Sequence, residues 1–293
     1  MKNKLSLFAV PYVGWMSIFV VAPIIIMVVY AFSTAAGDFT LENFARMGTY
    51  TAVFTRSFKL AIIATLIALL IGYPVSYMLS KEGPQVQRIA MVLIMLPMWM
   101  NFLLRTYSWM SILENNGLLN QLFQQIGLID LYNQVAMHFA ADPAAYVPID
   151  HFQMIGTQGA VVLGMVYNSL PFMILPIYSV LVKLDHSLIE AARDLGASSV
   201  QVFRKVILPL SLPGVLSGIT MVFVPSVSTF AISRLLGGGT QMMLGDLIEQ
   251  QFLGGAYNPQ LGAAIALVMM AIVVVCMLVM NRFGDGEEQA VML

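Results

Sequence analysis

The chain has 293 residues, of which 59% are hydrophobic and only 10% are charged, and its formal net charge is −1. Soluble domains carry charge on about a quarter of their residues, so this composition excludes an ordinary soluble globular protein and indicates an integral membrane protein. The single cysteine, Cys276, excludes an internal disulfide framework and most cysteine-based metal sites. We expect no nucleic-acid partner and no bound metal.

Six apolar segments are each long enough to cross a bilayer as a helix, which takes about 20 residues. The first exceeds the apolar core of a cleaved signal peptide, so we expect it to be retained; small residues at 33–36 keep cleavage as the alternative. The pattern predicts an all-α integral membrane protein with six transmembrane helices. The segments are residues 5–32, 60–79, 89–109, 159–181, 212–236 and 261–280.

The distribution of lysine and arginine predicts which side of the membrane each loop faces. With the N-terminus in the cytoplasm, nine of the 14 basic residues lie on the inner side, and five lie on the outer side or at outer helix ends. Cytoplasmic loops carry an excess of basic residues, so this orientation is favoured. It places both termini and residues 187–209 in the cytoplasm. The outer side then holds eight acidic residues against five basic ones, a net charge of −3.

The long polar stretch after the first apolar segment divides the chain into an N-terminal part and a larger core. We expect residues 1–57 to form a helix and an outer loop, and residues 58–283 to form a core of five helices. The third segment is rich in polar and aromatic side chains: Trp99, Asn101, Arg105, Tyr107 and Trp109. Arginine at the bilayer centre costs about 2.5–3.5 kcal/mol, so Arg105 is expected either to face protein or water, or to reach the outer interface beside the aromatic rings.

Residues 115–158 are expected to form a long outer loop, and Glu114 stands at its start. This carboxylate is placed either to meet a cationic solute or to end a helix in solvent. The spacing of His138, Asp142, Asp150 and His151 fits no standard metal-ligand pattern, so we expect a solvated or partner-facing loop.

Residues 187–209 form a polar stretch between the fourth and fifth apolar segments, and they predict two short helices that meet at Gly196. A serine stands three residues before Glu190 and another three residues before Gln201, which is the spacing of capping boxes that start helices. A glycine at the junction allows the left-handed conformation that often ends a helix. Pro209 is expected to end the second helix or to kink it into the next apolar segment.

The fifth apolar segment contains a proline followed by several hydroxyl side chains. We expect a break at Pro225, since a proline-interrupted helix with hydroxyl groups suits the border of a water-filled pathway. Ordinary packing by small residues is the alternative. Phe230 is a candidate aromatic gate or a packed core ring. Arg234 follows at the outer end of the segment, and we expect Asp246 or Glu249 to pair with it.

The spacing within residues 187–209 resembles the EAA loop of bacterial ABC importer permeases. The family pattern is Glu-Ala-Ala, three residues, Gly, nine residues, Ile, one residue and Leu-Pro, and only Val206 departs from it. The resemblance implies a type I ABC importer permease fold, in which this loop is the cytoplasmic coupling helix that docks into a groove on an ATPase. The matching residues are Glu190, Ala191, Ala192, Gly196, Leu208 and Pro209.

A second resemblance involves residues 96–120, LPMWMNFLLRTYSWMSILENNGLLN, which are similar to the corresponding region of spermidine/putrescine permeases. Together the resemblances imply a multi-pass subunit of the bacterial inner membrane that translocates a polyamine delivered by an extracytoplasmic binding protein. They also imply a second permease subunit and two ATPase subunits, which would bind ATP and Mg, with no cofactor on this chain. The sequence contains no nucleotide-binding fingerprint and no nucleophile–base pattern, so an enzyme is not expected.

Two alternatives remain open at this point. An importer permease for thiamine, iron, sulfate or an opine-like compound would share the fold, which does not determine the substrate. A channel or a secondary transporter would share the six helices and have no use for the EAA loop. Residues 284–293 are expected to be a cytoplasmic tail. The candidate residues of the substrate pathway are Trp99, Asn101, Tyr107, Trp109, Glu114, Tyr167, Phe230, Arg234, Asp246 and Glu249.

Overall fold

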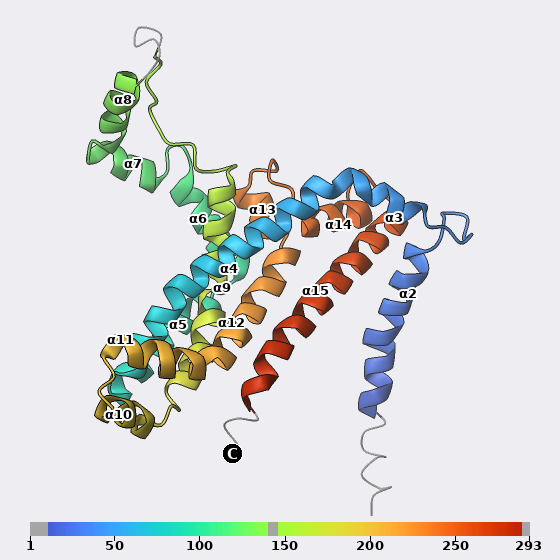
Figure 1. Cartoon of the computed structure of the whole chain (residues 1–293). Helices are drawn as coiled ribbons and strands as arrows, with labels where there is room; N and C mark the ends of the chain where they lie inside the picture. The colour runs from blue at the N-terminus through green and yellow to red at the C-terminus, as the bar shows by residue number, and fades with distance from the viewer. Residues whose placement is uncertain (1–10, 140–145, 289–293) are drawn as a thin grey trace, which may run out of the picture.

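The computed structural model describes residues 11–139 and 146–288, with side chains up to residue 280 (Figure 1). Asp142 of the expected outer loop, the first residues of the first apolar segment and the last residues of the expected tail lie outside these ranges. All regular elements of the described chain are helices, and one isolated β-bridge joins Ser33 and Phe39.

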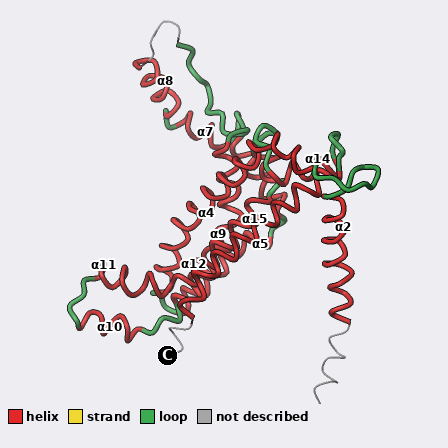
Figure 2. Tube along the Cα trace, turned by 45° about the vertical axis from the view of Figure 1, so that its right-hand side comes forward, coloured by secondary structure: helices red, strands yellow, loops and turns green. Residues whose placement is uncertain are grey.

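Five helices are long and apolar enough to cross a membrane, and a bent pair of helices brings the number of candidate spans to six. The spans run side by side, as Figure 2 shows for α4, α9, α12 and α15. The six predicted spans are therefore present in the described chain, although one of them is bent. Their bounds are Pro11–Ala31, Glu42–Ser80, Pro84–Trp99 with Phe102–Gln125, Gln158–Leu181, Ser199–Ser228 and Pro259–Met280.

Three helices form the centre of the fold: α4 (Thr51–Ser80), α9 (Gln158–Leu181) and α12 (Leu208–Ser228). Glycines allow α9 and α12 to approach closely. A Cβ added at Gly214 or at Gly218 would lie 2.8 Å from an atom of α9. Small residues at such crossings let two helices gain dispersion contacts without a hydrophobic driving force between them.

The N-terminal span lies at the edge of the molecule, where α2 (Ala22–Ala31) packs along α15 (Pro259–Glu288) (Figure 1). Next come α3 (Glu42–Arg46) and the 3₁₀ turn η2 (Met47–Tyr50), which lead directly into α4. The expected outer loop therefore ends earlier than residue 57, because residues 51–57 already form the first two turns of α4.

The third apolar segment is not one straight helix, as predicted, but a pair: α5 (Pro84–Trp99) and α6 (Phe102–Leu113). The two arms of this span are bent by 90°. At the bend, Met100 has an extended backbone, and the Asn101 side chain accepts hydrogen bonds from the amides of residues 103 and 104 at 2.8 and 3.4 Å. Asparagine is a favoured N-cap, so Asn101 starts a new helix instead of continuing the old one.

The fifth segment also breaks, but not at Pro225 as predicted. Helix α12 continues through Pro225 to Ser228, and the chain leaves the helical conformation at Thr229, where ψ is 141°. The short helix α13 (Ala231–Leu236) follows and packs against α6. A proline removes one hydrogen bond from a helix, and neighbouring helices in a membrane bundle tolerate that loss.

The region expected to be a long outer loop contains two helices, α7 (Leu118–Gln125) and α8 (Leu128–Phe139), which project away from the bundle (Figure 2). Asn120 fixes α7 to the returning chain, since its side-chain amide donates to the carbonyl of Phe152 and accepts from the amide of the same residue, both at 3.0 Å. On the same end of the molecule, α14 (Leu244–Leu253) joins α13 to α15.

Candidate functional site

Residues 186–202 form an elbow of two helices, α10 (His186–Asp194) and α11 (Ser199–Val202), at the end of the molecule opposite α7 and α8 (Figure 1). Gly196 lies at the bend with φ of +81°, as predicted. Its amide donates to the carbonyl of Arg193 at 2.8 Å, and the next amide donates to the carbonyl of Ala192 at 3.1 Å. These two bonds are those of a Schellman motif, which satisfies carbonyls at a helix end.

The start of the elbow differs from the prediction. The N-cap of α10 is Asp185, not Ser187: the Asp185 carboxylate accepts from the amide of Ser187 at 2.9 Å. This backbone hydrogen bond holds the pKa of Asp185 below its ordinary value. The second predicted capping box is confirmed, because Ser198 and Gln201 exchange side-chain and backbone bonds at the start of α11.

Beyond α11 the chain passes through the π-helical turn η3 (Phe203–Ile207) into α12 without a stop. Pro209 therefore does not end a helix; it is the second residue of α12, directly after η3, and because the chain is helical on both sides its missing amide leaves the preceding turn one donor short. The ring of Phe203 packs edge-on against Tyr73 and Tyr77 of α4, with centroids 5.9 and 5.4 Å apart. Through η3 the elbow is thus connected to two of the three central helices, α4 and α12.

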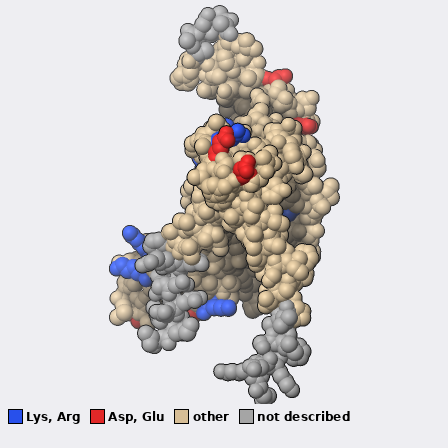
Figure 3. Space-filling view, turned by 90° about the vertical axis from the view of Figure 1, so that its right-hand side faces the viewer, with Lys and Arg blue, Asp and Glu red and all other residues tan. Residues whose placement is uncertain are grey.

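The two faces of the elbow differ. Ala192 and the residue after Gly196 pack against the core together with buried Val202, whereas Glu190 and Ala191 are exposed. On the exposed face Leu195 and Val200 leave 89% and 73% of their surface uncovered. Basic groups gather at the elbow end of the molecule and acidic groups toward the opposite end (Figure 3). The exposed face of the elbow therefore presents apolar side chains that nothing in the described chain covers, a feature typical of a protein–protein contact.

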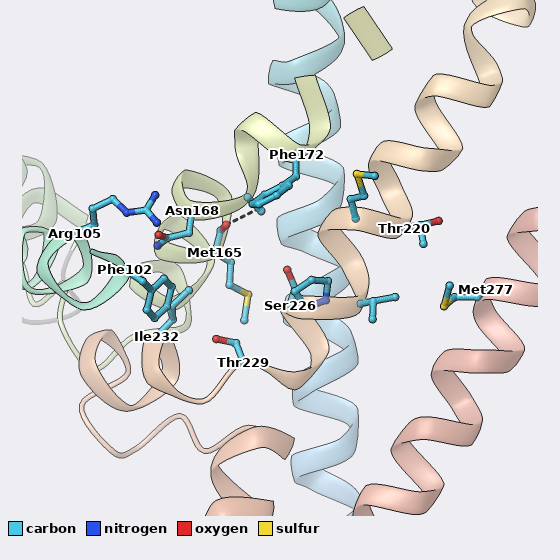
Figure 4. Close-up of a pocket in the computed structure, with 14 residues that line it drawn as sticks. Phe102, Arg105, Met165, Asn168, Phe172, Thr220, Ser226, Thr229, Ile232 and Met277 are labelled. Atoms are coloured by element: carbon cyan, nitrogen blue, oxygen red, sulfur yellow. Dashed lines mark hydrogen bonds between the residues drawn. The ribbon is translucent and has the colours of Figure 1, made fainter. Parts of the chain in front are cut away.

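The second feature is a cavity of about 600 Å³ in the bundle (Figure 4). Both helix breaks contribute to it: α6 begins beside it with Phe102, and the chain leaves α12 beside it at Thr229. Irregular backbone at membrane depth is tolerated where it lines a cavity or is buried in protein. The lining residues are Phe102, Arg105, Met165, Asn168, Ser169, Phe172, Thr220, Met221, Val224, Pro225, Ser226, Thr229, Ile232 and Met277.

Arg105 is the charged residue of this lining, and only 8% of it is exposed. Its side chain faces the protein interior. Of the two alternatives from the sequence, a side chain facing protein or water and one reaching the outer interface beside aromatic rings, the structure therefore favours the first. Figure 4 places its guanidinium beside the amide of Asn168. In residues 11–139 and 146–280 neither Nε nor Nη1 of Arg105 finds a hydrogen-bond partner, and the same is true of Oδ1 of Asn168, whose Nδ2 donates to the carbonyl of Gly164 at 2.9 Å.

None of the ten predicted pathway residues lines this cavity within the described chain. Asn101 caps α6, and Trp109 packs edge-on against Tyr167 with the centroids 5.3 Å apart. The side chains of Trp99 and Tyr107 are exposed, as is Glu114 at the end of α6. Phe230 is half exposed beside the second helix break. The sequence analysis weighed Arg105 without counting it among the pathway candidates, and it expected the hydroxyl groups after Pro225 to border a pathway, as Ser226 and Thr229 border this cavity. The polar lining residues that it did not propose are Asn168, Ser169 and Thr220.

The three remaining candidates lie together at the end opposite the elbow. Arg234 pairs with both oxygens of Glu249, at 2.6 and 3.1 Å, so the predicted pairing is confirmed. Asp246 lies 3.9 Å from the Nε of Arg234 and is 4% exposed. It accepts from the hydroxyl of Ser233 and from the amide of Met243, and burial raises its pKa. Asp246 thus holds α13 to α14.

The lever-like elbow and the cavity between broken helices are features of a membrane transport subunit, and the comparison with protein families identifies the class. Residues 65–286 match the family described as the binding-protein-dependent transport system inner membrane component. The chain belongs to this family. It is therefore an inner membrane component of a binding-protein-dependent transport system, and its curated relatives are transport permeases.

Among curated proteins, the spermidine/putrescine transport system permease protein PotB of Escherichia coli is 35% identical over 281 residues, covering 93% of this chain and 95% of PotB. PotB of Haemophilus influenzae is also 35% identical and covers 93% of each chain. The inner membrane ABC transporter permease protein YdcU of E. coli is 28% identical, over 79% of this chain and 71% of YdcU.

Solved structures show the same fold. One is a bacterial ABC transporter involved in the import of alginate, with a TM-score of 0.76 and 16% identity over 97% of this chain and 96% of that one. Another is the methionine transporter MetNI in an inward-facing conformation, with a TM-score of 0.54 and 19% identity over 84% of this chain and 98% of that one. The predicted all-α fold of a type I ABC importer permease is confirmed.

Proposed function

We propose that this chain is one permease subunit of an ATP-driven importer that translocates a polyamine, spermidine or putrescine, delivered by a binding protein. The proposal depends chiefly on the 34–35% identity to PotB over 93% of the chain. The acidic side chains toward the end opposite the elbow agree with a polycationic solute, because they attract cations over about 10 Å (Figure 3).

The elbow is the proposed coupling helix. Its exposed apolar residues, Leu195 and Val200, dock into a groove on an ATPase, and Glu190, Ala191 and Gly196 lie at the same contact. When two ATPase subunits close on ATP, each drags its elbow with it. The Phe203 contact with α4 and the continuous path into α12 transmit this movement to the central helices. Leu208 and Pro209 start α12 at the joint.

This assignment places the elbow and both termini in the cytoplasm and the α7–α8 end outside. The bound ATP and Mg belong to the ATPase subunits, and this chain binds no cofactor. A second permease subunit completes the pathway, and the binding protein docks at the outer end. Alternating access then results from movement of the two permease subunits against each other.

One observation favours a second candidate, an anionic solute. The cavity lining contains the guanidinium of Arg105 and no carboxylate, so an anion would find a charge partner there and a polyamine would not. A sulfate or an opine-like solute would fit this chemistry. A channel or a secondary transporter is disfavoured, because neither has a use for the elbow.

The deciding experiment is ATP hydrolysis by the complex that co-purifies with this chain, measured with its binding protein and with spermidine or sulfate added. We expect hydrolysis to rise with spermidine and not with sulfate. Stimulation by sulfate alone would show that the solute is an anion, and it would leave the assignment as an importer subunit unchanged. A preparation with no ATPase subunit and no hydrolysis would refute the importer assignment itself.

A further inference from the structure

Within the described residues, Arg105 is a buried cation without a counter-charge. It lies in the first turn of α6, 8% exposed, and two of its guanidinium nitrogens have no partner among the side chains and backbone that the structure describes. Its neighbour in the cavity, Asn168, likewise has an unpaired side-chain oxygen. Within a membrane, ionisable side chains pair with one another or with backbone carbonyls, because an isolated charge in a low dielectric is costly. The described part of the chain therefore leaves this group unsatisfied.

The surroundings of Arg105 show what kind of group is missing. Among the described residues no acidic side chain lines the cavity, whose polar lining is otherwise hydroxyl and amide. The cavity is open on one side, and its apolar rim is exposed: Met221 by 52%, Phe172 by 39% and Phe102 by 37%. An occupant that fits is apolar over most of its surface and presents one carboxylate, which accepts the free donors of the guanidinium.

We propose that this occupant is a helix of the second permease subunit, which inserts an aspartate or glutamate side chain into the cavity and pairs with Arg105. The inference rests on the proposed function only in assuming that a second permease chain is present. An apolar membrane helix covers the exposed rim, and its carboxylate supplies the missing counter-charge. The amide of Asn168 lies beside the pair and offers its free oxygen to a protonated or hydroxyl group of the same helix.

This pairing also removes a difficulty of the polyamine assignment. A lone guanidinium in the pathway repels a polycation, whereas an ion pair presents no net charge. The alternative source of a carboxylate is the solute itself, which would make Arg105 a substrate-binding residue. The two sources differ in the step that requires Arg105. A carboxylate on the second permease subunit makes Arg105 necessary for assembly of the complex, whereas a carboxylate on the solute makes it necessary only for transport.

The first test compares stability with and without the second subunit, using Arg105→Gln, Arg105→Lys and, as a control, Arg46→Gln, which removes an exposed charge paired with Glu42. In the isolated full chain, Arg105→Gln should leave the melting temperature unchanged or raise it, because it removes an unpaired buried charge. In the complex it should lower recovery of the second permease subunit at least tenfold. Arg105→Lys should retain part of that recovery, and Arg46→Gln all of it.

The second test places a photo-crosslinking residue at Met221 on the cavity rim, with Leu70, exposed on α4 and absent from this lining, as the comparison. We expect Met221 to yield an adduct with the second permease subunit. An adduct with lipid alone would overturn the proposal. So would full recovery of that subunit with Arg105→Gln, or equal destabilisation of the isolated chain and the complex.

One further result would assign the carboxylate to the solute and so overturn the proposal: an intact Arg105→Gln complex whose hydrolysis no longer responds to solute. Assembly and crosslinking are measured without any solute. Their outcome therefore does not depend on the polyamine assignment. That assignment fails if spermidine does not stimulate ATP hydrolysis by the wild-type complex.

Discussion

Replacing Gly196 with valine tests whether the angle of the elbow transmits ATP hydrolysis to the membrane helices. Gly196 has φ of +81°, and a Cβ added there meets no atom within 4 Å. The penalty is therefore conformational and not steric crowding by neighbours. An L-residue in the left-handed region costs about 1–2 kcal/mol, and a β-branched residue is an outlier there.

That penalty reduces the population of the observed elbow geometry about 5- to 30-fold. We expect uptake by the Gly196→Val complex to fall by a similar factor, while ATP hydrolysis persists and the chain still inserts, because Gly196 lies outside the apolar spans. Gly196→Asn is the matched control, since asparagine tolerates the left-handed conformation, and it should keep most of the uptake.

The assay is solute uptake and ATP hydrolysis measured on the same proteoliposomes, with the amount of inserted chain determined for each variant. Normal uptake by Gly196→Val at normal insertion would refute the reasoning. Equal loss with valine and asparagine would also contradict it, because the effect would then not follow the backbone conformation.

Three further predictions concern packing and charge. Glu249→Lys should impair uptake, since it leaves Arg234 without its bidentate partner and adds a second cation at the end opposite the elbow; unchanged uptake would show that transport does not depend on this pair. Gly214→Ala should destabilise the chain by about 1–3 kcal/mol and so lower its melting temperature, because the added Cβ would lie 2.8 Å from the carbonyl oxygen of Pro176. An unaltered melting temperature would contradict this contact. Burial raises the pKa of Asp246 in the folded chain above its ordinary 3.8. Folding therefore favours the protonated carboxyl group, and the stability gained from this preference is lost as the pH rises from 3.8 through the raised pKa of the folded state. Asp246→Asn should abolish that loss in melting curves recorded across the acid range, and a variant that keeps the wild-type pH dependence would show that another group is responsible.

The sequence alone predicted the features that depend on local bonding. Six apolar segments of sufficient length predicted six spans, since backbone groups in a bilayer must be satisfied within the helix. Gly196 and the capping box of α11 were predicted because turn and cap chemistry involve neighbours a few residues away. The pairing of Arg234 was predicted from charge, but the sequence did not distinguish Glu249 from Asp246.

Only the tertiary structure decided how the broken helices meet. The bend at Asn101 and the break at Thr229 both follow a proline by four residues, but other prolines of the chain, such as Pro74 and Pro171, lie inside unbroken helices. A proline permits a break, but packing against neighbouring helices determines whether the freed backbone groups find partners in a straight helix or a bent one.

The same reason explains why the sequence candidates for the pathway and the cavity lining differ. Position along a span does not reveal which face of a helix looks into the bundle when the crossing helices are unknown. The burial of Arg105 against Asn168 joins residues 63 positions apart, and Asp246 became structural only through contacts with α13. Local pattern thus determined the spans and the elbow, and the packing of α6, α9, α12 and α13 determined which side chains share a cavity.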